Sequence, residues 1–148
     1  MTDIYDRLKQ DHDEQRELIK KIEATDGNTD ERQKLYKSFR EEALAHANAE
    51  EIVFYSAMMQ THDGQDKARH SVAEHKEMDD VIEELDKLEF SNSGWMTKFR
   101  QLSHLLIHHV DEEEDEIFVC AKEVISAADA KAMVPEFDKK KARQESEV

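Results

Sequence analysis

The 148-residue chain contains 38% hydrophobic and 39% charged residues and has a formal net charge of −15. This charge argues against binding to nucleic acids or to anionic membrane surfaces, both of which require basic patches. No apolar run approaches the ~20 residues that cross a bilayer, the N-terminal MTDIYDRLKQ does not resemble a signal peptide, and the single Cys120 cannot form an internal disulfide. We therefore expect a soluble, cytoplasmic protein without a nucleic-acid or membrane partner.

Only three glycines and one proline occur in the chain, which favours long helices over sheets. Loops are predicted at ATDGNTD, THDGQ and FSNSG, and short loops make successive helices antiparallel. The sequence predicts an all-α protein with an up-down-up-down four-helix bundle at 1–124, and a short helix with a charged, frayed tail at 125–148. Asp30, Ser93 and Ser126 are the expected N-caps of the second, fourth and short helices. The four long helices are predicted at 3–24, 30–60, 65–89 and 94–124.

Apolar residues spaced three and four apart define one buried stripe on each helix. Each stripe contains one histidine, and two stripes contain a glutamate one turn later. The segment HHVDEEED at 108–115 illustrates the assignment, because His109 and Glu113 lie on the stripe whereas His108 and Glu112 lie about 100° around the helix. The polar residues predicted to point inward are His12, His46, Glu50, His75, His109 and Glu113.

These side chains are expected at one level of the bundle. Each histidine lies 12 to 16 residues from the same end, which places all four about 18–24 Å from it. A buried carboxylate is costly unless it is paired or bound to metal, and neither lysine nor arginine lies on the four stripes. A positive charge must therefore come from elsewhere.

Histidine nitrogens combined with two carboxylates suit first-row transition metals better than calcium or magnesium. The six side chains exceed the four ligands of a structural zinc site. Two metal ions, each with two histidines and sharing both glutamates as bridges, would use all six.

At these residues the chain resembles haemerythrin, and specifically the haemerythrin-like HHE cation-binding domains. The resemblance rests on DHDEQREL, HANAEEIVFY, AEHKEMDDVIEEL and HVDEEEDEIF in order, and covers residues 3 to about 122. It implies a non-haem centre of two iron ions with an oxo or hydroxo bridge, ligated by the six residues above. It also implies binding or sensing of a small molecule such as dioxygen.

The chain departs from oxygen-carrying haemerythrins at two positions. Where those proteins have a second histidine on the third helix, this chain has Asp79, and its fourth helix has His-x-x-x-Glu in place of His-x-x-x-x-Asp. Reversible oxygen carriage is therefore disfavoured. Asp79 is either a seventh ligand or a solvated acid at the helix edge.

Three functions remain open from the sequence. The favoured one is a di-iron protein that binds or responds to dioxygen or oxidants. The alternatives are a di-iron enzyme acting on peroxide or nitric oxide, and a structural bundle stabilised by zinc or manganese. No motif identifies a protein partner. Tyr5 and Tyr55 either approach the site or, as the favoured alternative, are ordinary packing residues. Cys120 is expected to be a small buried apolar residue.

Overall fold

The computed structural model describes residues 2–147, and all regular secondary structure within that range is helical. The all-α prediction is therefore confirmed. The elements are α1 (Ile4–Glu23), α2 (Asp30–Glu50), η1 (Glu51–Tyr55), α3 (Ser56–Met59), α4 (Gln65–Asp86), α5 (Trp95–Glu112), η2 (Glu113–Ile117), α6 (Phe118–Val124) and α7 (Ala127–Glu147).

Local sequence signals set the beginnings of these helices. Asp3 and Asp6 cap α1 reciprocally, each side chain accepting from the other residue's backbone N–H. Thr29, and not the predicted Asp30, caps α2 by accepting from the backbone N–H of Arg32 at 3.1 Å. The predicted cap Ser126 accepts from the backbone N–H of Asp129 at 3.1 Å.

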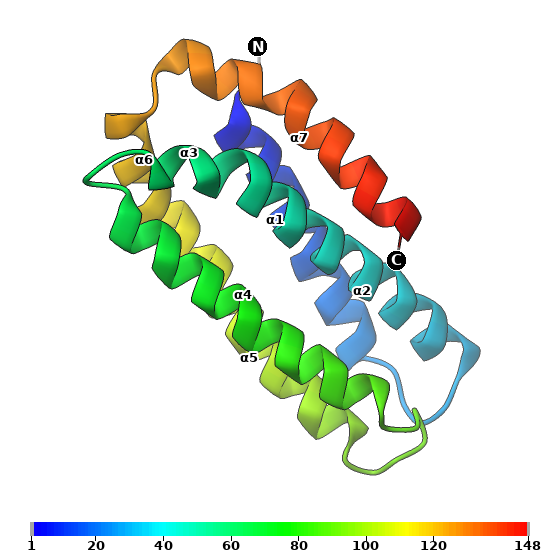
Figure 1. Cartoon of the computed structure of the whole chain (residues 1–148). Coiled ribbons are helices and arrows are strands. Elements are labelled where there is room, and N and C mark those ends of the chain that lie inside the picture. Colours follow the sequence, from blue (N-terminus) through cyan, green and yellow to red (C-terminus); the bar gives the residue numbers. More distant parts are fainter. Residues whose placement is uncertain (1, 148) are drawn as a thin grey trace.

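The long helices lie side by side (Figure 1), with α1 against α2, α4 against α5, and further contacts from α1 to α5 and from α2 to α4. Two apolar clusters fill the interior. One contains Leu8 and Phe54, and the other contains Ile19 and Phe99. Between Leu8 and Ile19, the buried residues of α1 are all polar: Asp11, His12 and Gln15. A polar layer therefore separates two apolar cores, and that layer contains the candidate site.

Two π-helical turns interrupt the predicted second and fourth helices. In η1 the backbone N–H of Ser56 bonds to the carbonyl of Glu51, and in η2 the N–H of Phe118 bonds to the carbonyl of Glu113. Each turn begins at or directly after a glutamate of the polar layer. A π turn accommodates one extra residue, so it rotates the buried stripe beyond that point. As a result Val53, Phe54 and Tyr55 are all buried.

The prediction of a short helix followed by a frayed tail is wrong. Helix α7 continues through Pro135 to Glu147 and packs along α2 and α1 (Figure 1). Phe137 is fully buried and Lys141 is only 8% exposed. The buried face of α7 was not predicted because the segment is mostly charged. A few buried residues spaced about one turn apart give only a weak periodic signal.

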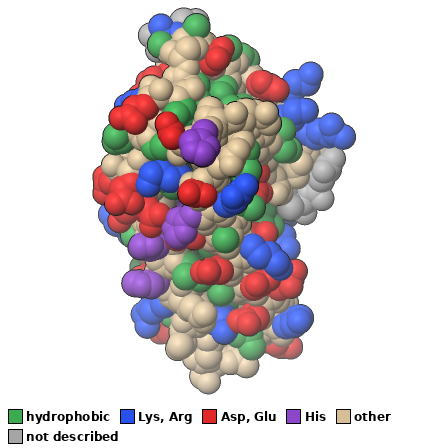
Figure 2. Space-filling model, turned by 60° about the vertical axis from the view of Figure 1, so that its left-hand side comes forward, with side chains coloured by type: hydrophobic (Ala, Val, Ile, Leu, Met, Phe, Trp, Pro, Cys, Tyr) green, Lys and Arg blue, Asp and Glu red, His purple; other side chains and the backbone are tan. Residues whose placement is uncertain are grey.

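The surface contains many acidic side chains, and on the face shown in Figure 2 several histidines lie among them. Within the described residues, no helix combines the length and the apolar character needed to cross a membrane.

Candidate metal centre

The structure brings the six predicted inward residues together in the polar layer. His12 is contributed by α1, His46 and Glu50 by α2, His75 by α4, and His109 by α5, while Glu113 begins η2. None of the six is more than 4% exposed. The helical periodicity therefore identified their positions correctly. By contrast, His108 is 60% exposed at its side chain, as the assignment of HHVDEEED to two faces requires.

The two glutamates lie between two pairs of histidines. Glu50 places Oε2 at 3.4 Å from His46 Nε2 and Oε1 at 3.2 Å from His75 Nε2. Glu113 places Oε1 at 3.1 Å from His12 Nε2 and Oε2 at 3.3 Å from His109 Nε2. Each carboxylate thus presents one oxygen to the pair His12 and His46 and the other oxygen to the pair His75 and His109. A ligand shared by two metal ions requires this arrangement.

Several of these inward atoms lack hydrogen bonds although they are fully buried. They are His12 Nε2, both carboxylate oxygens of Glu50, and Glu113 Oε1. In addition, His75 Nε2 and His109 Nε2 face each other at 3.0 Å. Buried polar atoms are normally satisfied, so a group of unsatisfied nitrogen and oxygen atoms aimed at one space fits a cation.

Carboxylates outside the centre hold the other ring nitrogen of three histidines. His46 Nδ1 lies 2.8 Å from Asp11, and His12 Nδ1 lies 2.7 Å from Glu114. His109 Nδ1 lies 2.8 Å from Glu74. A carboxylate that accepts from Nδ1–H leaves the Nε2 lone pair free to point inward and fixes the ring.

The fourth histidine has a looser arrangement. His75 Nδ1 lies 3.7 Å from Glu51 and has no hydrogen-bond partner. The outer acids of His75 and His12 nevertheless occupy equivalent positions in the sequence. Glu51 directly follows the inward Glu50, and Glu114 directly follows the inward Glu113. The apolar stripes did not identify this outer set of acids, because Glu114 and Glu74 lie beside the stripes and not on them. The pairing of adjacent glutamates in the two similar motifs was the available signal.

Helix α7 contributes a lysine that forms ion pairs with buried acids beside the centre. The ammonium of Lys141 lies 3.0 Å from Asp11 and forms a short contact with Glu42, and both acids are buried. Asp11 also forms a 2.6 Å ion pair with Arg7. Asp11, Glu42 and His46 form a cluster of metal-type ligand atoms, but Lys141 already provides a cation there.

In the absence of metal, the acids strongly raise the pKa values of the buried histidines. Burial alone lowers the pKa of a histidine, but Glu50 and Asp11 raise the pKa of His46 from 6.5 to about 10. Glu113 and Glu74 likewise outweigh burial and raise the pKa of His109 to about 10. Conversely, burial raises the pKa of Glu113, but His109 and His12 hold it well below its usual value. Protons on the histidines therefore balance the buried carboxylates when no metal is bound.

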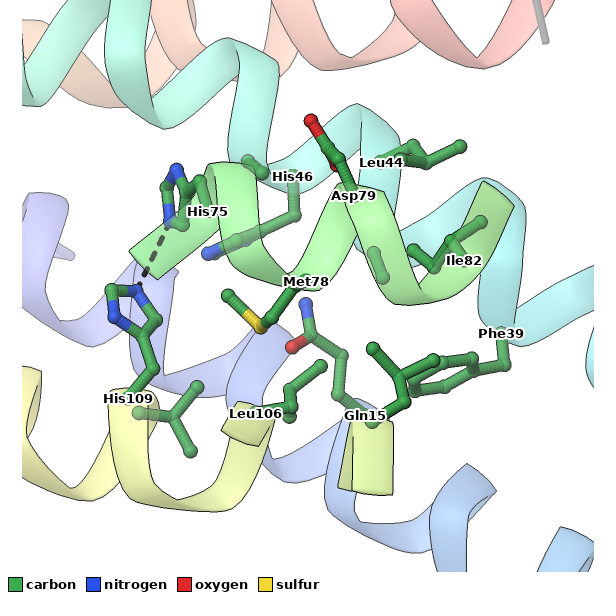
Figure 3. Close-up of a pocket in the computed structure, with 14 residues that line it drawn as sticks. Gln15, Phe39, Leu44, His46, His75, Met78, Asp79, Ile82, Leu106 and His109 are labelled. Atoms are coloured by element: carbon green, nitrogen blue, oxygen red, sulfur yellow. Dashed lines mark hydrogen bonds between the residues drawn. The ribbon is translucent and has the colours of Figure 1, made fainter. Parts of the chain in front are cut away.

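A pocket reaches the centre from the side of α2, α4 and α5 (Figure 3). His46, His75 and His109 lie on its wall, and the other lining is mainly apolar, including Phe39, Met78, Ile82 and Leu106. Asp79 also lines the pocket, one turn along α4 from His75, and is half-buried. Among the described residues Asp79 belongs to no cluster of metal-type ligand atoms, so the structure favours the interpretation of a helix-edge acid.

Tyr55 approaches the centre, Tyr5 packs in the apolar core as favoured, and Cys120 is more exposed than expected. Tyr55, which the π turn directs inward, donates a short hydrogen bond from its hydroxyl to Glu113 Oε2. Tyr5 is buried and packs edge-on against Phe54 and Phe118. Cys120 is half-buried, not fully buried, and its thiol lies 3.7 Å from the carbonyl of Asp63.

Four buried histidines and two buried glutamates between packed helices define a helical cation-binding protein. The comparisons with known proteins agree with this class. The family described as Hemerythrin HHE cation binding domain matches residues 3–121. The chain therefore belongs to the haemerythrin HHE cation-binding domain family.

Two individual relatives are similar to the chain. A solved structure of a haemerythrin HHE cation-binding-domain protein from Mycobacterium kansasii superposes with a TM-score of 0.88, at 23% identity, over 99% of this chain and 90% of that one. A DNA nickase from Nostoc sp. (strain PCC 7120) is 23% identical over 140 residues, which is 95% of this chain. The chain spans only 39% of the nickase.

Proposed function

We propose that this protein is a non-haem di-iron protein that binds or responds to dioxygen or related oxidants. The observation that carries the proposal is the placement of one oxygen of Glu50 and one of Glu113 beside each histidine pair, at 3.1–3.4 Å from the Nε2 atoms. His12 and His46 would hold one ion, and His75 and His109 the other. Bound iron would supply one-electron redox chemistry.

The surroundings of the centre support a small, uncharged reactant. The pocket that reaches His46, His75 and His109 is lined mainly by apolar side chains, and such lining favours molecules like dioxygen over charged metabolites. The even division of histidines, two for each ion, leaves both ions with the same number of nitrogen donors. This evenness favours oxidation over the reversible carriage that needs one saturated ion and one open ion.

Exposure to oxygen is therefore expected to oxidise ferrous-loaded protein to a form that persists after the oxygen is removed. The protein is loaded with ferrous iron without oxygen, mixed with oxygen, and then returned to anaerobic buffer while optical spectra are recorded. We expect the spectrum to remain that of the oxidised form until a reductant is added. Complete return of the ferrous spectrum without reductant would instead indicate oxygen carriage.

Two controls accompany this experiment. Zinc-loaded protein should show no spectral change with oxygen, because zinc has no redox chemistry. Asp79→Ala should retain the wild-type iron content and oxidation rate, because Asp79 lies outside the ligand clusters of the described chain. A loss of iron in this variant would make Asp79 a ligand.

The metal-free protein is expected to lose stability between pH about 7 and about 10. His46 and His109 have pKa values of about 10 when folded, against an ordinary 6.5. The folded state therefore binds more protons than the unfolded state in this window, so unfolding becomes easier as the pH rises through it. Metal-loaded protein should not show this loss, because metal replaces the protons. Urea unfolding at several pH values measures both forms, and a metal-free protein whose stability is constant or rises over this window would contradict the account.

A further inference from the structure

A second cluster of histidines and glutamates lies on the surface between α4 and α5. His70 Nε2 lies 2.8 Å from Glu112 Oε1 and 3.5 Å from Glu74 Oε2. His108 Nε2 approaches the same two carboxylates, at 3.1 Å from Glu112 Oε2 and 3.6 Å from Glu74 Oε2. One ligand atom each from His70, Glu74 and Glu112 lies within 4.8 Å of the others. Side chains from two helices thus converge on one small volume at the surface.

The cluster repeats the pattern of the buried centre. His70 and Glu74 are four residues apart on α4, and His108 and Glu112 are four apart on α5, the spacing that also separates His109 from Glu113. The sequence HHVDEE therefore contains two interleaved His-x-x-x-Glu pairs about 100° apart on the helix. One pair faces the core and the other faces the surface, where histidines lie beside acidic side chains (Figure 2).

Ordinary surface ion pairing does not account for this arrangement. Within the part of the chain that the structure describes, the ion pairs of Glu74 and Glu112 are all with histidines. Isolated surface ion pairs contribute only about 0–1 kcal/mol, which is little to hold two imidazoles against the same two carboxylates. Two imidazoles facing two carboxylates form a nitrogen and oxygen donor set for a transition-metal ion.

Glu74 connects this surface cluster to the interior. Its Oε1 lies 2.8 Å from His109 Nδ1, while its Oε2 faces His70 and His108. The side chain of Glu74 is only 14% exposed, whereas those of His70 and His108 are 52% and 60% exposed. Acids at Asp111, Asp115 and Glu116 line an adjoining hollow with His108 and would attract cations to the surface.

We propose that His70, Glu74, His108 and Glu112 form a second, surface site for a divalent transition-metal ion such as zinc or ferrous iron. His70, Glu74 and Glu112 supply three ligands from the group that already lies close together. His108, which approaches the same two carboxylates from α5, supplies the fourth when the ion binds. The site is exposed, so its ion exchanges with solvent, whereas ions in the buried centre are enclosed. Glu74 links the two sites, because it is a ligand of the surface site and the partner of His109 Nδ1 in the buried one. This site is independent of the proposed oxygen function.

Zinc titration of the full chain, followed by proton–nitrogen NMR of the imidazoles, tests the proposal. We expect the Nε2 signals of His70 and His108 to shift together as one zinc ion binds. The signals of His12, His46, His75 and His109 report separately on the buried centre, so failure of either site is distinguishable from failure of the other. Unchanged His70 and His108 signals at saturating zinc would overturn the proposal.

Paired variants give a second readout. The double variant His70→Ala/His108→Ala should bind one zinc ion fewer per chain than wild type at equilibrium, whether or not the buried centre is filled. His104→Ala removes an exposed histidine from the same helix but outside the cluster, and should bind as wild type does. Because the substituted side chains are exposed, circular dichroism should show both variants folded. Equal zinc content in the double variant and wild type would reject the site.

Discussion

The Glu113→Ala variant is expected to lose both iron ions, although it removes a single side chain. Glu113 Oε1 lies 3.1 Å from His12 Nε2 and Oε2 lies 3.3 Å from His109 Nε2, so the same carboxylate serves both histidine pairs. Removal of a ligand that both ions share weakens the binding of both ions at once. Iron content after anaerobic loading and desalting should fall from two ions per chain toward none, with helical content retained by circular dichroism.

Glu112→Ala is the matched control, because it removes the neighbouring carboxylate from the surface side of the same helix. This variant should keep both iron ions that remain bound after desalting. The reason is that, among the described ion pairs, Glu112 contacts only His70 and His108. Loss of a single ion from Glu113→Ala would contradict the shared-ligand arrangement. Equal losses in the two variants would show that the assignment of helix faces is wrong.

The Phe137→Ala variant is expected to lower the free energy of unfolding by about 3–5 kcal/mol, the usual cost of removing a buried aromatic side chain. Phe137 is fully buried, and its ring lies 5.6 Å from that of His46 and 5.1 Å from the guanidinium of Arg7. Urea unfolding of metal-free protein measures the change. The large effect follows from the packing of α7 on α1 and α2.

Glu136→Ala provides the comparison at the adjacent position of α7, where the side chain is exposed. Its free energy of unfolding should change by no more than about 0.5 kcal/mol, as is usual for surface substitutions. If Phe137→Ala were equally mild, α7 would not be docked in solution, and the expectation of a frayed tail would be restored.

The inward polar residues were predictable because helical periodicity and charge point to the same positions. His12 and His109 lie on strong apolar stripes, between Leu8 and Ile19 in the first case and between Leu106 and Ile117 in the second. An acid or a histidine on such a stripe needs a partner, so the four stripes together predict one polar layer. The glutamates that the histidines face were found by the same reasoning.

Other features depend on tertiary contacts that the sequence pattern does not encode. Asp11 and Glu74 lie one residue away from the stripe on their helices, and only the neighbouring helix shows that each reaches a histidine Nδ1. The π turns shift the periodicity after the metal-type glutamates, so the apolar stripe alone did not place Tyr55 against Glu113. Helix α7 contributes Lys141 to Asp11 across 130 residues of sequence, beyond the range of any local pattern.

The most direct test of the di-iron proposal is a crystal structure of the iron-loaded protein with anomalous scattering measured at the iron edge. We predict two iron positions in the buried layer, one beside His12 and His46 and the other beside His75 and His109, with Glu50 and Glu113 between them. A single buried iron position, or iron found only at the surface, would contradict the proposal.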